Sequence, residues 1–389
     1  MHLVEVSTPA HRKEFLQLPV RLYKDEPNYI RPIDDDVESV FDPQKNKYFR
    51  HGKCIRWIVQ DNAGETVGRV AAFINHKQAD KETQPTGGMG FFHAVNNQEV
   101  ANLLFDACKN WLAEKGMEAM DGPINFGDRD RWWGLLANGY NLEPNYCMPY
   151  NFPYYIQLFE NYGFQVYFKQ FTYGRAVKDK VTDKMEERAA RIFKDSNYHF
   201  EPLNKKNLDK YTEDFRQVYN KAWAKHQGVG DMSERVAKSI MKKLKPVMDP
   251  NIIWFGYYKN EPISFYINLP ELNQIFKHLN GKLNWWGKAK FLYYKLTGKN
   301  DKMLGLVFGV VPSHQGKGIE SAMAKSITKY VWDNKRSPYE YLEMNWIGDF
   351  NPKMINIVEE VGARVVKTHY TYRYLFDRSK PFERCPVIQ

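Results

Sequence analysis

Paired cysteines are missing from this chain of 389 residues. Its four cysteines are widely scattered, and no two of them form a C-x-x-C pair; they are Cys54, Cys108, Cys147 and Cys385. The sequence therefore indicates neither a disulfide framework nor a zinc site, and we expect no bound metal. This sparse use of cysteine fits a reducing, cytoplasmic setting.

Long apolar runs are missing as well. No stretch approaches the ~18 uninterrupted apolar residues of a membrane-spanning helix. Residues 1–6 lack the basic segment and apolar run of a signal peptide, so we do not expect one. The sequence predicts a cytoplasmic protein and leaves open peripheral contact with the inner face of the cytoplasmic membrane.

Positive charge and aromatic side chains are plentiful. The formal net charge is +10, and 15% of the residues are aromatic. A basic surface favours an anionic partner such as a phosphorylated cofactor or an acidic membrane, although a solvated basic surface has the same composition. The basic residues fit no recognised DNA- or RNA-binding signature, so we do not predict a nucleic-acid partner.

An internal repeat determines the predicted domain organisation. The segments 153–173 and 352–372 share Pro, Ile, Glu, Gly, Val, Thr and Tyr at one constant offset. We interpret this agreement as a duplication, with two generic helix–glycine–strand units as the alternative. The length favours two domains, and the linker is expected near 178–184, where charged residues interrupt the apolar pattern.

The order of expected elements is similar in the two halves. The second half begins with a strand at 200–203, helices at 206–223 and 232–246, and strands at 252–259 and 262–269. It continues with a strand at 304–311, a helix at 316–334, a strand at 339–346, a helix at 352–361 and a strand at 363–376. This alternation predicts an α/β (α+β) fold.

A glycine-rich loop after a buried strand carries the most informative pattern. The apolar strand at 304–311 is followed by Pro312 and then by Gln315-Gly316-Lys317-Gly318 at the start of a helix. Backbone N–H groups at a helix N-terminus lack intrahelical partners and can converge on one anion, and glycine allows that anion to approach closely. The loop therefore suits a pyrophosphate, with a plain glycine-containing helix cap as the alternative.

This pattern resembles a known superfamily. V-x-P-x-x-(Q/R)-G-x-G-(I/V) after an apolar strand is similar to the acyl-CoA-binding motif of the GNAT N-acetyltransferases, and the match covers residues 199–376. The run from Gly122-Pro123 to Tyr154-Tyr155 further resembles the tandem-GNAT family typified by the bacterial protein YghO. Similar proteins include bacterial acyltransferases that N-acylate long-chain amines in sphingolipid synthesis.

The resemblance implies two tandem GNAT-like domains, each a mixed, mostly antiparallel sheet flanked by helices. Residues 1–178 would form a degenerate copy, and residues 179–389 would form the N-acyltransferase domain that uses acetyl-CoA or a longer acyl-CoA. The pyrophosphate would contact main-chain N–H groups of the loop, and the N–H near Val310 could polarise the thioester carbonyl. The residues assigned to the cofactor are Val310, Val311, Gln315, Gly316, Lys317, Gly318, Ile319 and Asn351.

Three departures from the family pattern stand out. Glu320 replaces the usual small residue after the loop, which brings a carboxylate near the pyrophosphate. Val358 replaces the usual Tyr general acid, and its counterpart in the first half is Phe159. The first half has no glycine at 95–99, where the phosphate loop should be. We therefore expect one CoA site, in the second half.

The amine must lose a proton on acyl transfer, so we looked for a base. Glu343 is the first candidate because it lies on the predicted strand 339–346, and Asp349 and Glu320 follow. Tyr372 or Tyr370 could replace the missing acid. A solvated or structurally paired carboxylate, or a packed tyrosine, is the alternative in each case.

Residues 272–302 form an insertion that mixes Lys with Trp, Phe and Tyr. It is either a solvated basic helix pair or an element that contacts an anionic membrane or an acyl chain. The cluster at 128–133 is similarly either a surface loop or a loop that faces the substrate. Two functions remain: an N-acyltransferase acting on a small-molecule or lipid amine, and a protein that binds CoA or lipid without turnover. The sequence does not determine the oligomeric state.

Overall fold

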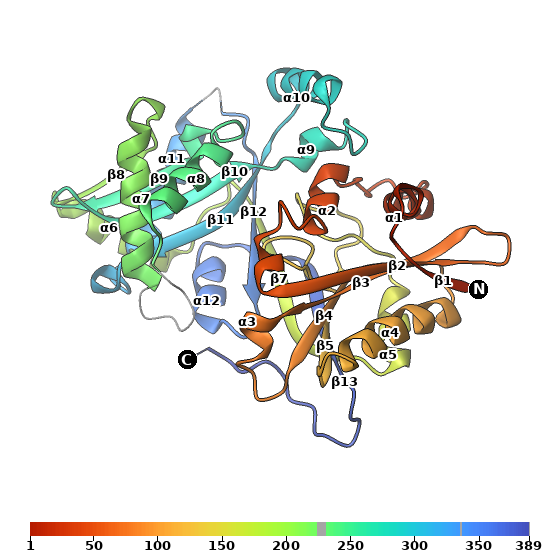
Figure 1. The fold of residues 1–389 in the computed structure, drawn as a ribbon. Helices are drawn as coiled ribbons and strands as arrows, with labels where there is room; N and C mark the ends of the chain where they lie inside the picture. Colours follow the sequence, from red (N-terminus) through yellow and green to blue (C-terminus); the bar gives the residue numbers. More distant parts are fainter. Residues whose placement is uncertain (224–230, 335–336, 389) are drawn as a thin grey trace.

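The computed structural model describes residues 1–223, 231–334 and 337–388. We refer to residues 1–178 as the first half and to residues 179–389 as the second half. Each half carries its own helices, and both contribute strands to a sheet that runs through the whole molecule (Figure 1). The C-terminal strand β13 lies within the first half rather than at the outer end of the second.

The first half alternates strands and helices in the predicted order. Its elements are β1 (His2–Glu5), α1 (Pro9–Leu22), α2 (Asp34–Val40), η1 (Lys47–Arg50), β2 (Gly52–Gln60), β3 (Thr66–Asn75), α3 (His76–Ala79), β4 (Thr86–Ala94), α4 (Gln98–Ala113), β5 (Ala119–Gly122), β6 (Leu135–Asn138), α5 (Tyr155–Tyr162) and β7 (Gln165–Ala176). Asn97 caps α4 by accepting hydrogen bonds from the N–H groups of Glu99 and Val100.

The second half repeats this order and adds several helices. Its elements are α6 (Asp183–Lys194), β8 (Tyr198–Pro202), η2 (Lys205–Asn207), α7 (Leu208–Trp223), α8 (Glu234–Leu244), η3 (Pro250–Ile252), β9 (Ile253–Tyr258), β10 (Glu261–Pro270), α9 (Asn273–Phe276), α10 (Trp285–Thr297), β11 (Lys302–Val310), η4 (Pro312–His314), α11 (Ile319–Asp333), β12 (Tyr341–Gly348), α12 (Pro352–Glu360) and β13 (Arg364–Leu375).

Thirteen strands of the described residues form one mixed sheet. Its order is β1-β2-β3-β4-β5-β13-β7-β12-β11-β10-β9-β8, and β6 pairs with β13 beside this path. The pairs β4–β5 and β11–β12 are parallel, and the other pairs are antiparallel. This mixed, mostly antiparallel sheet flanked by helices confirms the predicted fold class.

The two halves exchange their last strands. β13 of the second half pairs with β5 of the first, and β7 of the first half pairs with β12 of the second. Tyr173 on β7 donates a hydrogen bond to Glu359 on α12, and Tyr372 on β13 donates one to Glu160 on α5. These reciprocal contacts join residues that the sequence repeat matched, so each half completes the sheet of the other.

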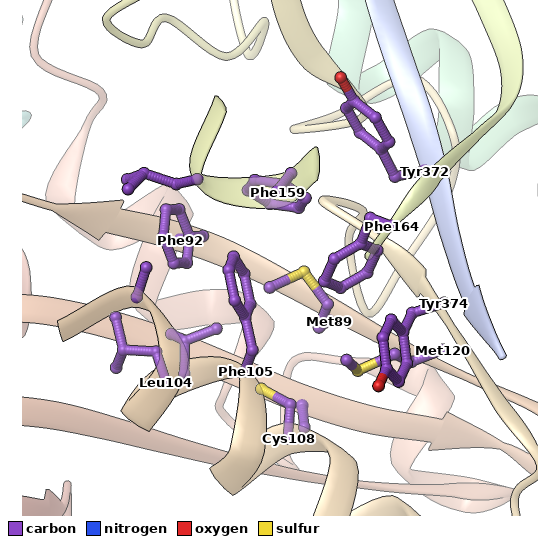
Figure 2. Packing of buried hydrophobic residues seen from close by; sticks show 14 of the residues in the cluster. Met89, Phe92, Leu104, Phe105, Cys108, Met120, Phe159, Phe164, Tyr372 and Tyr374 are labelled. Carbon is purple, nitrogen blue, oxygen red and sulfur yellow. The ribbon is translucent and has the colours of Figure 1, made fainter. Parts of the chain in front are cut away.

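The core of the first half is densely filled with aromatic rings. Figure 2 shows Phe92 from β4, Phe105 from α4 and Phe159 from α5 meeting in one cluster. The rings of Phe92 and Phe105 stack with centroids 4.8 Å apart, and Phe159 approaches Phe105 edge-on at 4.8 Å. Tyr372 packs against Phe159 from the exchanged strand.

The core of the second half has two layers, one on each face of the sheet. Helices α7 and α8 pack on one face against β9 and β10 through residues such as Phe215, Met241 and Phe265. Helices α11 and α12 pack on the other face through residues such as Ile327 and Val358. The second layer is less completely filled, which leaves the cleft described below.

Several elements of regular structure were not predicted from the sequence, among them α6, α2 and β6. Helix α6 follows directly on the expected linker, and the analysis assigned no helix there. The short helix α2 and the short strand β6 both lie in segments that were left without regular structure. The periodic pattern of α6 is short and highly charged, and its apolar face, with Met185, Ala189 and Ile192, is buried by the second half.

Candidate functional site

Two parallel strands of the second half separate along their length. β11 and β12 pair from Lys302 opposite Tyr341 to Gly305 opposite Met344, and beyond this point they diverge. β12 continues along β7 with a register irregularity between Met344 and Ile347, where Trp346 has a positive φ of 71°. This irregularity draws β12 away from β11 and opens a V-shaped gap in the sheet.

An apolar cleft lies at this gap, between the sheet and helices α11 and α12. It is open to solvent, and the empty space within it and at its mouth comes to about 820 Å³. Its walls include Tyr266, Met303, Gly305, Leu306, Val307, Phe308, Glu320, Ile327, Leu342, Met344, Asn345, Met354, Ile357 and Val358. Walls of this character suit a flexible ligand that is mainly apolar.

The glycine loop lies between the end of β11 and the start of α11. Gly316 and Gly318 both have positive φ values, of 73° and 102°, which favour glycine. A Cβ on Gly316 would meet no atom within 4 Å, whereas one on Gly318 would lie 3.1 Å from the Cβ of Arg188 on α6. The outer side of Gly316 is therefore open to a ligand, and Gly318 is held against α6.

At the end of β11 the backbone N–H groups alternate between the two edges of the strand. Val311 donates its N–H to the carbonyl of Ile263 on β10. Because successive residues of a strand point their N–H groups to opposite edges, that of Val310 points toward the gap. The carbonyl of Val310 accepts a hydrogen bond of 2.9 Å from Nε2 of Gln315, so this side chain ties the loop to the strand.

Glu320 places a carboxylate at the loop. Burial raises its pKa, while the backbone N–H groups of Glu320 and Gly316 lower it by a smaller amount. The carboxylate thus faces the N–H groups that the sequence analysis assigned to the pyrophosphate, and it also lines the cleft. Arg188 is the nearest cation that contributes to this balance.

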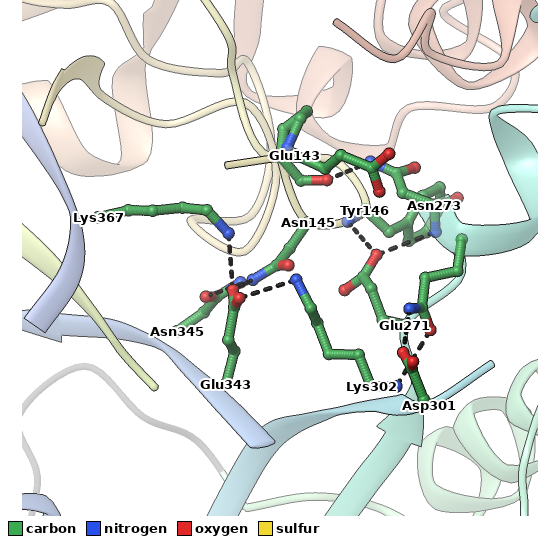
Figure 3. A network of polar contacts seen from close by, with 12 residues as sticks. Glu143, Asn145, Tyr146, Glu271, Asn273, Asp301, Lys302, Glu343, Asn345 and Lys367 are labelled. Atoms are coloured by element: carbon green, nitrogen blue, oxygen red, sulfur yellow. Dashed lines mark hydrogen bonds and ion pairs between the residues drawn. The ribbon is translucent and has the colours of Figure 1, made fainter. Parts of the chain in front are cut away.

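Glu343 lies in a buried network between the two halves, beside the gap (Figure 3). Its Oε1 accepts from Nζ of Lys302 at 2.8 Å, and its Oε2 accepts from Nζ of Lys367 at 2.7 Å. Oε2 also accepts from Asn145 of the first half at 2.7 Å. Burial acts to raise the pKa of Glu343, but the two lysines outweigh it and hold the pKa below 4.5.

A second buried carboxylate extends this network. Oε1 of Glu271 accepts from the N–H of Tyr146 at 2.7 Å and from that of Asn273 at 2.9 Å. Burial raises the pKa of Glu271 to about 7, and Lys302 opposes this shift. Asn273 donates to the carbonyl of Pro144. The network therefore fixes the loop around residues 144–146 of the first half against the second half.

The other expected site residues are placed differently. Tyr372 is fully buried in the core of the first half, because β13 is exchanged, so it lies away from the cleft. Asp349 follows β12 and accepts from Arg384 at 2.5 Å. Asn351 caps α12 by accepting from the N–H of Met354. Ile319 is buried in the core, and Lys317 is exposed beside the loop.

The matching region of the first half is closed. The N–H of Ile124, just after β5, donates to the carbonyl of Met89 on β4 at 2.7 Å and so bridges the two strands. At the end of β4, Ala94 donates its N–H to the hydroxyl of Tyr155, and its carbonyl accepts from the hydroxyl of Tyr154. Phe159 fills the position that Val358 takes in the second half.

Several residues of this region were missed by the sequence analysis. Lys367 and Asn145 were not considered, and Lys302 was grouped with the basic insertion. Arg188 lies beside the loop because α6 packs there. A lysine at an inward position of the apolar strand β13 was the available signal for Lys367, which is 2% exposed. The contacts of Asn145 depend on tertiary structure alone.

The chain is similar to two curated bacterial proteins over almost its whole length. It is 27% identical over 382 residues to the "Bacterial ceramide synthase" of Caulobacter vibrioides, covering 96% of this chain and 97% of that protein. It is 26% identical over 371 residues to "Protein YghO" of Escherichia coli, covering 92% of both chains. The chain is a homologue of YghO. No family model matches the chain.

Solved structures agree with this relationship at the level of the fold. A tandem GNAT protein from the clavulanic acid biosynthesis pathway is 10% identical, with a TM-score of 0.55, and the match covers 97% of this chain and 99% of that one. A GCN5-related N-acetyltransferase from Sphaerobacter thermophilus is 8% identical, with a TM-score of 0.51 and 98% of both chains covered. The chain therefore has the tandem GNAT fold.

Proposed function

We propose that this YghO homologue is an N-acyltransferase that moves an acyl group from a CoA thioester to a primary amine. The observation that carries the proposal is the gap between β11 and β12, with an apolar cleft on one side and the glycine loop at its end. In the first half the corresponding strands are bridged by Ile124. One CoA site, in the second half, follows from this difference.

The residues present fit an acyl-CoA in three respects. Gly316 leaves open space beside the start of α11, where backbone N–H groups and the helix dipole favour a pyrophosphate. The N–H of Val310 points into the gap, where it can donate to a thioester carbonyl and stabilise the oxyanion that forms on it. The apolar walls of the cleft suit a pantetheine arm with its acyl chain.

The reaction requires a neutral amine to attack the thioester carbonyl. A C–N bond forms, the C–S bond breaks, the amine loses one proton and the departing thiolate gains one. Glu343 is held as a carboxylate by two lysines, so its oxygens are poorly available to accept the proton of the amine. We assign it a positioning role beside the gap, because it joins β12 to the loop that carries Asn145.

We further propose a long-chain lipid amine as the acceptor. One relative of the chain is named for ceramide synthesis, and ceramide is an N-acylated long-chain amine. The match covers nearly the whole chain, so the likeness includes both halves. The exposed apolar side chains of the insertion at 272–302, described below, are consistent with a lipid substrate.

A binding protein without turnover is the second candidate. Val358 stands where the family has its general acid, and it lines the cleft without an ionisable group. Glu320 places a carboxylate at the loop, and Glu343 is paired with two lysines, so neither residue has the surroundings expected of a free catalytic base. Under this alternative the cleft would bind CoA or lipid, and no amide would form.

The two candidates are separated by a scan of acyl-CoAs against amines. We would incubate the purified chain with thioesters from acetyl-CoA to palmitoyl-CoA and with small and long-chain amines, and follow free thiol and amide product. Thiol release matched by amide, largest with a long-chain amine, supports the proposal. Calorimetric binding of CoA without thiol release for any pair would instead support the binding protein.

A further inference from the structure

Helix α10 presents large apolar side chains to solvent. In Figure 1 it lies at the outer edge of the molecule, above α9. Five of its residues are more than half exposed: Trp285 at 66%, Trp286 at 62%, Leu292 at 56%, Tyr293 at 61% and Leu296 at 75%. Such a concentration of exposed apolar area on one helix is uncommon for a surface that faces only water.

These exposed side chains form one face of the helix. Trp285, Ala289, Leu292 and Leu296 follow at spacings of four, three and four residues, so they lie along one stripe, with Trp286 and Tyr293 beside it. The opposite face is attached to the protein: Gly287 is buried, and Phe291 contacts the ring of Phe276. The exposed stripe therefore points away from the body of the molecule.

Positive charge surrounds the stripe. At a helical pitch of 3.6 residues, Lys288 and Lys290 lie on its two borders, and both are exposed. Between residues 273 and 300 the chain has six lysines and no Asp or Glu. An apolar stripe bordered by lysines matches a surface with an apolar interior and anionic groups at its boundary.

We propose that the exposed face of α10, defined by Trp285, Trp286, Leu292, Tyr293 and Leu296, docks onto an anionic lipid bilayer. The helix would lie in the plane of the interface, with the indoles at the level of the headgroups and the lysines near lipid phosphates. With 13 residues it is too short to span a bilayer. Among the described residues no helix is long and apolar enough to cross a membrane.

This docking surface is independent of the proposed catalytic function. The helix α9, which contacts α10 through Phe276 and Phe291, begins two residues after Glu271, so α10 is attached to the part of the second half that carries Glu271. A lipid held in that bilayer would therefore be near the second half. The docking itself needs neither CoA nor turnover, so vesicle binding can be measured without any substrate.

The test is sedimentation of the full chain with vesicles of phosphatidylcholine, with or without phosphatidylglycerol. Wild-type protein should bind the anionic vesicles more strongly, and salt should weaken this binding. Trp285→Ser/Trp286→Ser should lower vesicle binding at least about tenfold at any salt concentration, because two aromatic rings that would lie within the bilayer interface are lost. Lys288→Gln/Lys290→Gln should lower it about fivefold per lysine, at low salt only.

Matched controls change the same residue types elsewhere. Phe193→Ser removes an aromatic side chain that is 47% exposed on α6, and Lys242→Gln/Lys243→Gln removes two lysines from α8. Neither should alter vesicle binding. Wild-type protein that ignores anionic vesicles, or a tryptophan variant that binds as well as wild type, would overturn the proposal. So would a lipid-free dimer that the tryptophan variant abolishes, because a second copy would then cover the face.

Discussion

The first half and the second half share one scaffold but differ where two parallel strands meet. In the first half, Ile124 bridges back to Met89, and the rings of Phe92, Phe105 and Phe159 fill the space beneath. In the second half, β12 continues along β7 and leaves β11, and smaller or more flexible side chains line an open cleft. The difference shows that a duplicated fold can keep its strand order while one copy fills the space between sheet and helices that the other leaves open.

The exchanged strands explain why the closed half is retained. β7 of the first half pairs with β12, the strand that borders the gap. β13 of the second half in turn pairs with β5 in the sheet of the first half. Both strands carry a tyrosine that bonds to a glutamate on a helix of the other half. The closed half therefore stabilises the open one, whatever chemistry it lacks.

The largest effect should come from a carboxylate in the glycine loop. Gly316→Asp should weaken CoA binding more than about a hundredfold, because like charge against a bound anion costs several kcal/mol. The new Cβ meets no protein atom, although the positive φ adds some strain. Calorimetric titration with CoA measures the effect.

Asn97→Asp is the matched control in the first half. Asn97 caps α4 at the position that corresponds to the loop, and a carboxylate also caps a helix well. This variant should bind CoA as wild type does. Equal losses in the two variants would mean that the open half is not the only CoA site.

Removing the charge of Glu343 should mainly destabilise the protein. Glu343→Gln leaves Lys302 and Lys367 without their counter-charge and should cost about 3–5 kcal/mol of unfolding free energy. The counterpart Asp121→Asn breaks a less buried pair with Arg373 and should cost about 1–3 kcal/mol. Denaturant unfolding of both variants measures this comparison.

The pH dependence of this effect has a defined sign. The pKa of Glu343 is lowered on folding, so its contribution is present above the unfolded value of 4.5 and is lost as pH falls through the folded value. The difference in unfolding free energy between wild type and Glu343→Gln should therefore become smaller at acidic pH. A ~10²-fold loss of turnover at full stability and unchanged CoA affinity would instead make Glu343 the base.

Exchanging the aliphatic residue of α12 and the aromatic residue of α5 at their matched positions should have different effects on CoA binding in the two halves. Val358→Phe places a ring in the open cleft and should weaken CoA binding at least about tenfold, as bulk replaces ligand volume. Phe159→Val in the closed half should leave CoA binding unchanged and cost about 2–3 kcal/mol of stability, because it creates a cavity. Unchanged CoA binding by Val358→Phe would place the ligand elsewhere.

The smallest effect is expected at Glu320. Its carboxylate faces the N–H groups of the loop, so Glu320→Gln should tighten CoA binding about three- to tenfold. Burial raises the pKa of Glu320, and an anionic ligand favours its neutral form. Wild-type affinity should thus rise as pH falls through this raised pKa, whereas the variant should show no such rise. If the CoA affinities of wild type and Glu320→Gln changed with pH in the same way, the Glu320 carboxylate would not be acting on the bound anion.

The elements of the fold were largely predictable from local pattern. The apolar patterns of the second half gave α7, β9 and β10 to within a few residues. The helix–glycine–strand repeat correctly matched α5 and β7 with α12 and β13. Helix α6 was missed, because its polar composition hides a narrow apolar face that only packing makes significant.

The structure of the glycine loop was predictable because its pattern is local. Glycines at positive φ, a helix start and a preceding strand lie within one short run of residues, 304–319. The predicted roles of Glu343 and Tyr372 came from their strand positions alone. The structure surrounds the first with lysines and buries the second in the other half, and both outcomes depend on partners distant in sequence.

The sequence by itself determined most of the elements, their repetition in the two halves, and the glycine loop at the start of α11. Each of these depends on residues within a few turns of one another. The exchange of β7 and β13, the network that joins Glu343 to Asn145, and the outward direction of the α10 stripe were decided by tertiary structure. The physical reason is that strand pairing and burial depend on how well segments distant in sequence pack together and exclude water. A local sequence pattern does not encode which distant segment will be the partner.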